Sequence, residues 1–228
     1  MAQWRLRPAN RVGRCAASRN PHGRGRGFCS GLDLTDPFPD EATRGLEFPR
    51  SSMRRQERIA ELTTRLTNLR QPVIAAVNGP AYGGGFAIAM ASDIRIAAPS
   101  ARFCTQFIKL GLGGCDIGVS YTLPRIVGAG QAFDLILTAR TVEADEALRI
   151  GLVSRVSEES ALDDALAIAE TLCSYGKFGL ESTKQVLWAN LEAPSLQAAL
   201  QVENRSQILS SSSGELKAAT AAFATRKK

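Results

Sequence analysis

Apolar residues between positions 51 and 69 recur at the spacing of one helical face, and the chain then changes to a short, wholly apolar run. Pro72 cannot continue a helix, so we expect the helix to end before it. Residues 73–77 are a β-branched run typical of a buried strand, and residues 78–80 predict a turn after it. The helical face consists of Met53, Ile59, Leu62, Leu66 and Leu69.

Strand and helix patterns alternate up to about residue 160. Gly151 fits a helix end, because glycine readily adopts the left-handed conformation that closes many helices. The predicted elements are a glycine-rich turn at 82–85, an apolar helix from there to residue 91, a strand at 94–97, helices at 132–137 and 144–150, and a strand at 152–156.

The pattern becomes almost wholly helical from residue 161 to residue 223, with breaks near Gly176, Pro194 and residues 210–214. No repeat of fixed period is present. We therefore predict an α/β core over residues 27–160 and a C-terminal helical region over residues 161–228.

Length and composition fit a globular protein, since 228 residues can bury one sizeable core, and 44% hydrophobic with 22% charged residues is typical of soluble domains. The longest apolar stretch, residues 72–91, is interrupted by Asn78 and four glycines, which speaks against a membrane-spanning helix. Five cysteines without a C-x-x-C pair indicate neither a disulfide framework nor a zinc site, and they fit a reducing cytoplasm. The one histidine, His22, lies in an Arg- and Gly-rich stretch, so we expect no Ser-His-Asp or Cys-His mechanism.

Residues 1–26 form a basic leader, and no acidic residue precedes Asp33. We expect this leader to be poorly ordered and to carry the positive charge surplus more than the body does. A shifted start codon, an organelle transit peptide or a nucleic-acid-binding arm would each give this composition, and we favour the shifted start. Nucleic-acid binding has weak support, because Trp4 is the only aromatic residue in the leader.

Two segments closely resemble the signature of the enoyl-CoA hydratase/isomerase (crotonase) family. Residues 75–86 read AAVNGPAYGGGF, and residues 91–97 read ASDIRIA. Residues 28–33, FCSGLD, match a further element of that signature, and residues 137–142 and 147–153 extend the match. The resemblance covers the chain from about residue 26 onward and implies a ββα spiral core with a C-terminal helical oligomerisation region.

The resemblance implies an oxyanion hole made by the backbone N–H groups of Ser30 and Gly84, which would hold the thioester oxygen as it becomes an enolate. Independently, three successive glycines let the backbone approach a ligand closely at a helix N-terminus. Tight strand-to-helix packing or a phosphate loop would explain the glycines alone equally well. The substrate-binding residues that we expect are Gly83, Gly85, Phe107 and Phe223.

The hydratases of this family use a pair of glutamates, and the matching positions here are Ala87 and Phe107, which cannot transfer a proton. Asp116 lies among glycines just before a predicted helix, at a position that resembles the catalytic aspartate of dienoyl-CoA isomerases and of aromatic acyl-CoA dehalogenases. We predict Asp116 as the catalytic acid/base, with capping of that helix as the structural alternative. Asp33 and Asp93 are expected to brace the backbone.

The implied substrate is an acyl-CoA thioester, with no metal and no cofactor beyond the coenzyme A of the substrate. A homotrimer or hexamer in the cytoplasm is expected, without nucleic-acid or membrane partners. Family members precede residue 28 with strands and a helix that residues 1–26 do not resemble. A non-catalytic CoA-ester-binding or oligomer subunit is therefore the alternative function.

Overall fold

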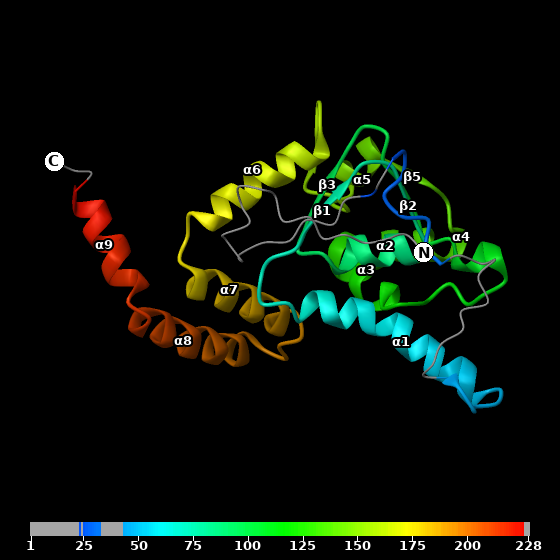
Figure 1. Cartoon of the computed structure of the whole chain (residues 1–228), viewed down its shortest axis with the longest axis horizontal. Helices are drawn as coiled ribbons and strands as arrows, with labels where there is room; N and C mark the ends of the chain where they lie inside the picture. Colours follow the sequence, from blue (N-terminus) through cyan, green and yellow to red (C-terminus); the bar gives the residue numbers. More distant parts are fainter. Residues whose placement is uncertain (1–22, 24, 33–42, 226–228) are drawn as a thin grey trace.

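Two three-stranded sheets form the centre of the protein (Figure 1). The computed structural model describes residue 23, residues 25–32 and residues 43–225, except for the side chains at 218 and 222–225. The first sheet has the order β1-β3-β6 and is parallel, and the second has the order β2-β4-β5, with β5 antiparallel to β4. The strands are β1 (Ile74–Val77), β2 (Pro80–Tyr82), β3 (Ile94–Ala97), β4 (Arg102–Cys104), β5 (Val142–Glu143) and β6 (Arg155–Val156).

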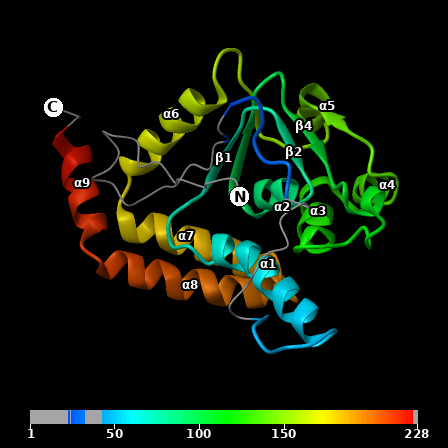
Figure 2. The ribbon, with the colours of Figure 1, turned by 45° about the vertical axis from the view of Figure 1, so that its right-hand side comes forward.

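Helices surround the sheets, and the last three form an arm that begins beside α1 and leads away from the sheets (Figure 2). The helices are α1 (Arg50–Thr67), α2 (Gly84–Ala91), the short 3-10 helix η3 (Phe107–Leu110), α3 (Val119–Val127), α4 (Ala129–Thr138), α5 (Ala144–Arg149), α6 (Ala161–Cys173), α7 (Lys177–Asn190), α8 (Leu196–Ser212) and α9 (Glu215–Thr225). Among the described residues, none of these helices is both long enough and apolar enough to cross a membrane.

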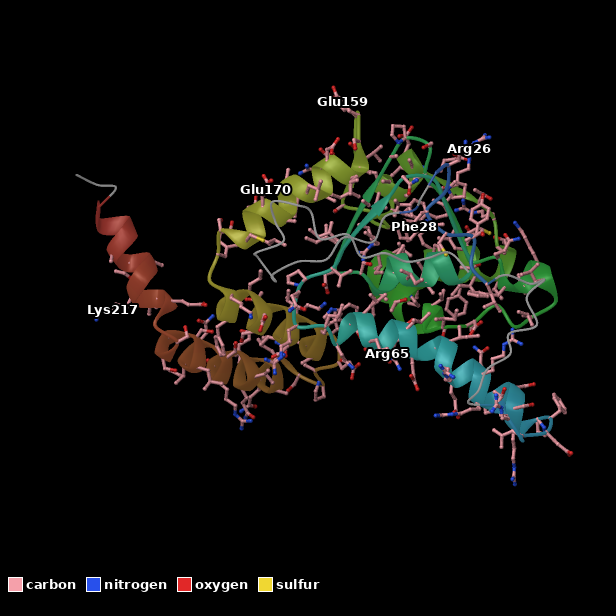
Figure 3. The ribbon with its side chains drawn as sticks, viewed as in Figure 1. Arg26, Phe28, Arg65, Glu159, Glu170 and Lys217 are labelled. Carbon is pink, nitrogen blue, oxygen red and sulfur yellow. The ribbon has the colours of Figure 1, made fainter. Side chains whose placement is uncertain are left out.

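Strand β1 is buried on both faces, as its unbroken apolar run requires. Ile74 and Ala76 pack toward α6, together with Ile96 of β3. Ala75 and Val77 belong to the larger core that contains α2 and α3. Figure 3 shows Phe28 among the crowded side chains of this core, whereas Glu159 and Glu170 project outward. The sheet therefore fixes the position of α2, whose first turn carries the glycine-rich sequence.

Most of the predicted elements are confirmed, including helix α1, strands β1 and β3, and the breaks in the C-terminal helices. Two expectations are wrong in detail. Pro80, predicted as part of a turn, is the first residue of strand β2, which pairs with β4. The strand predicted at 152–156 shrinks to β6, because Leu152 and Val153 are buried in the core and the Val153 N–H donates to the carbonyl of Ala147.

Helix α7 is held to the first sheet by contacts with Asp93, the residue just before β3. The buried ammonium of Lys184 lies 2.8 Å from Asp93 Oδ2 and also donates to the carbonyls of Leu66 and Gln71. The indole N–H of Trp188 donates to Asp93 Oδ1 at 2.7 Å, and the N–H of Val73 donates to Oδ2. Asp93 thus braces the backbone, as predicted.

Replacing Trp188 with phenylalanine is expected to lower the free energy of unfolding by about 2 kcal/mol, because a partly buried hydrogen bond to a charged group is lost. Urea unfolding followed by circular dichroism measures the change. Gln185→Ala, at an exposed position of the same helix, is the control, with an expected change of about 0.5 kcal/mol or less. Equal stability of wild type and Trp188→Phe would contradict the bracing role.

Candidate functional site

A short extended segment that contains Phe28 and Cys29 lies beside β2. Cys29 forms a parallel bridge with Ala81, and the N–H of Tyr82 donates to the carbonyl of Cys29 at 2.9 Å. The N–H groups of Phe28 and Cys29 both donate to the carbonyl of Pro80. This pairing places Ser30 and Gly31 next to the first turn of α2.

The two glycine-containing bends are packed so closely that a side chain would not fit at Gly85 and would be crowded at Gly31. A methyl group at Gly85 would lie 2.1 Å from the carbonyl oxygen of Cys29, and one at Gly31 would lie 3.1 Å from the amide nitrogen of Gly84. Gly83, which precedes α2, has φ +52° and ψ −117°, a conformation that residues with a side chain rarely adopt. The glycines therefore serve the close approach of two backbone segments.

The backbone amides of Ser30 and Gly84 are the candidate donors to a ligand. Neither donates to an acceptor within the described part of the chain, whereas the neighbouring Gly83 N–H donates to the carbonyl of Cys104 at 3.0 Å. Gly84 is the first residue of α2, so its N–H is one of the unpaired donors at the positive end of the helix dipole. Ser30 lies between Cys29 and Gly31, which approach Gly85 and Gly84, so its amide belongs to the bend packed against this helix end, where an anionic oxygen can bind.

The loop between η3 and α3 borders this position and carries Asp116. The side chain of Ile117 lies beside Gly84, with Cδ1 3.6 Å from where a methyl group of residue 84 would be. Asp116 is half-buried, and its Oδ1 accepts the N–H of Ile117 at 2.7 Å and the side-chain amide of Gln56 from α1. Asp116 is thus one residue from the group that contacts Gly84.

The structure does not support the capping alternative for Asp116. Helix α3 has Gly118 at its N-cap, and no side chain caps that end. Asp116 contributes to the first turn through its backbone carbonyl, which accepts the N–H of Val119 at 2.9 Å. The carboxylate is therefore left for another role.

The positions that match the hydratase glutamates are apolar and buried. Ala87 lies inside α2, and the ring of Phe107 lies beside Gly83, with Cε1 3.7 Å from a methyl group placed there. Phe107 can therefore line the site but cannot move a proton. Asp33 and the side chain of Phe223 lie outside the described residues, so their predicted roles stay predictions.

Cys29 lies beside the two amides but is a poor nucleophile. Burial raises the pKa of its thiol, and the hydrogen bond from the Gly31 N–H to Sγ only partly offsets this effect. In the described ranges, no group of three or more His, Cys, Asp or Glu side chains could hold a metal ion.

A sequence profile named "Enoyl-CoA hydratase/isomerase" matches residues 22–228. The chain belongs to this family. It is 44% identical over 187 residues to "Probable enoyl-CoA hydratase echA12" of Mycobacterium leprae, a match that covers 82% of this chain and 64% of that protein. It is 35% identical over 206 residues to "1,2-epoxyphenylacetyl-CoA isomerase" of Escherichia coli, covering 90% of this chain and 77% of the relative.

A solved structure supports the same assignment of the fold. A probable enoyl-CoA hydratase/isomerase from Mycobacterium abscessus superposes with a TM-score of 0.84 at 40% identity, over 92% of this chain and 79% of the other. The predicted crotonase family and α/β fold are therefore confirmed. The chain spans only 64% of the length of the Mycobacterium leprae relative, and the named relatives of this crotonase include both a hydratase and an isomerase.

Sequence reasoning missed one residue that contacts the candidate site, Gln56. It lies on α1, 60 positions before Asp116, and its side-chain amide holds the Asp116 carboxylate. The apolar pattern of α1 predicted the helix but gave no signal for this polar contact, which exists only once α1 packs beside the loop.

Proposed function

We propose that the protein binds an acyl-CoA thioester and stabilises the enolate formed from it with the N–H groups of Ser30 and Gly84. The observation that carries this proposal is the close packing of two bends whose amides have no acceptor in the described residues. A thioester oxygen gains negative charge as the enolate forms, and donors already in place stabilise that charge without reorganisation. Gly83, Gly85 and Phe107 would line the bound thioester.

Asp116 is the proposed acid/base. Its carboxylate would accept a proton from a carbon next to the conjugated system and return it to another carbon, so the double bond moves and no atom is gained or lost. One carboxylate suffices for this transfer, whereas the matching positions of the paired hydratase glutamates are apolar. Double-bond isomerisation of an enoyl-CoA is therefore the reaction that this set of residues favours. No cofactor beyond the substrate's coenzyme A is proposed.

We also propose that the arm of α7–α9 assembles the protein into a homotrimer or hexamer in the cytoplasm. Helix α8 has no buried residue, and its apolar side chains lie open to solvent in the single chain. Such a surface is typical of a subunit interface. The exposed apolar residues of the arm include Leu187, Leu196, Leu200, Ile208, Leu209 and Leu216.

The reaction is tested with 2-enoyl-, 3-enoyl- and dienoyl-CoA esters in D₂O, with the products followed by NMR. The proposal expects double-bond migration with deuterium incorporated at the carbon that regains the proton. Binding of these esters without turnover or incorporation would favour the alternative, a non-catalytic CoA-ester-binding subunit, which Ala87 and Phe107 support. Absence of any binding would contradict both functions.

Gln56→Leu is expected to lower kcat about tenfold with little change in KM, because the donor that orients the Asp116 carboxylate is lost at a cost of about 1.5 kcal/mol. Steady-state kinetics on the preferred ester measure the split between kcat and KM. Glu57→Gln, which changes the neighbouring exposed residue that pairs with Arg54, is the control. A purely structural Gln56 would leave kcat unchanged.

A further inference from the structure

A groove of about 690 Å³ lies between α1, α3 and α7, directly behind the loop that contains Ile117. Gly118 lines the groove, whereas the side chain of the preceding Ile117 lies beside Gly84 on the site. The groove-lining residues Thr63 and Gly118 therefore lie against Ile117, whose side chain is beside Gly84 of the proposed thioester site. Other groove-lining residues are Ala60, Thr63, Thr64, Trp188 and Ala189.

Ile117 is held firmly in this position. Its carbonyl accepts the hydroxyl of Thr63 at 2.7 Å, and its N–H donates to Asp116. Its φ of +49° is unusual for a β-branched residue and requires support from neighbours. The backbone of Gly118 packs tightly on Thr63, since a methyl group at residue 118 would lie 3.3 Å from Thr63 Cγ2. The Ile117 side chain is only 9% exposed and cannot easily swing aside.

The groove suits a hydrocarbon chain. Alanine side chains, threonine methyl groups and the Trp188 ring supply carbon surface along it, and Asn68 and Gln185 add two amide groups. The charged residue at its edge, Glu192, is engaged by the Tyr121 hydroxyl at 2.5 Å. A chain of methylenes entering from the Gly84 side would therefore meet mostly apolar atoms.

We propose that Ile117 sets the upper size of the acyl group, and that the groove accepts the far end of a longer chain when this side chain is shortened. The inference rests on the proposed function, because it assumes that the thioester oxygen binds at Ser30 and Gly84. The intact protein is then selective for short acyl groups, which end against Ile117.

The test measures the affinities of the full chain for the unreactive esters butanoyl-CoA and dodecanoyl-CoA by calorimetry. Ile117→Ala is expected to raise the ratio of dodecanoyl to butanoyl affinity about tenfold, the effect of burying about two further methylenes. Ile117→Val, which should fold even if the alanine variant does not, is expected to raise the ratio less. Adding Thr64→Trp, an exposed position that lines the groove, should fill it and abolish the gain.

An unchanged ratio in the Ile117 variants would overturn the inference while leaving the proposed function intact. A gain that survives Thr64→Trp would place the chain elsewhere and also overturn it. Light scattering of the single variant Thr64→Trp tests a further occupant. A change in its oligomeric state would show that a second copy covers the groove, which would also overturn the inference. If the wild type binds neither ester, the proposed function itself fails.

Discussion

Replacing Gly84 with proline is expected to lower kcat about 10²–10³-fold while α2 stays folded, because the variant lacks one of the two proposed oxyanion donors. Gly84 is the first residue of its helix, where the N–H has no partner in the helix and proline is well tolerated. The substitution therefore removes the donor without removing a helix hydrogen bond. Turnover of the preferred enoyl-CoA ester and far-ultraviolet circular dichroism measure the two effects.

The matched control is Gly84→Ala, which keeps the N–H. Its methyl group would lie 3.5 Å from Gly31 Cα and 3.6 Å from Ile117 Cδ1, both ordinary contact distances. We expect this variant to retain most of the activity. If alanine is as damaging as proline, crowding between the two bends and not the lost donor is the cause, and the oxyanion role of this amide is refuted.

Asp116→Asn is expected to lower kcat about 10²–10⁴-fold, because an amide cannot accept the proton that a carboxylate removes. Asparagine has nearly the same shape, and its oxygen can still accept the N–H of Ile117 and the amide of Gln56. The loop and the binding of an unreactive acyl-CoA should therefore be preserved. Turnover and deuterium incorporation from D₂O report the loss.

Asp134→Asn serves as the control for this charge change, since Asp134 is an exposed carboxylate on α4 that pairs with Arg140. It should leave turnover near the wild-type value. Full activity in Asp116→Asn would assign the proton transfer to another group and would leave the oxyanion proposal standing.

The parts of the fold that the sequence predicted are those encoded by neighbouring residues. Strand β1 and helix α2 follow from an unbroken apolar run and a glycine-rich turn, both of which act over a few positions. The pairing of Ser30 with Gly84 could be expected only through the family resemblance, because no local pattern relates residues 54 positions apart. The close packing of the two bends agrees with that expectation.

Contacts between distant segments were not predictable from the pattern. Strands β4 and β5 are only three and two residues long, and each is defined by the strand it pairs with. Gln56 and Thr63 reach the Asp116–Ile117 loop across 60 and 54 positions, from a helix whose sequence shows only an ordinary amphipathic face. The contacts of Gln56 and Thr63 with this loop therefore form only when α1 packs beside it, and no sequence pattern predicts them.

The bond between Asp93 and helix α7 decides where the protein can be shortened. Ending the chain before Lys177 would leave the Asp93 carboxylate without its ammonium and indole donors and the carbonyls of Leu66 and Gln71 without the ammonium that they accept. Ending the chain after Asn190 would discard the solvent-exposed α8 and α9 and keep every one of these contacts. A chain that ends after α7 therefore keeps the Asp93 contacts but loses the Glu215 carboxylate, which accepts the N–H groups of Phe178 and Gly179 at the start of that helix.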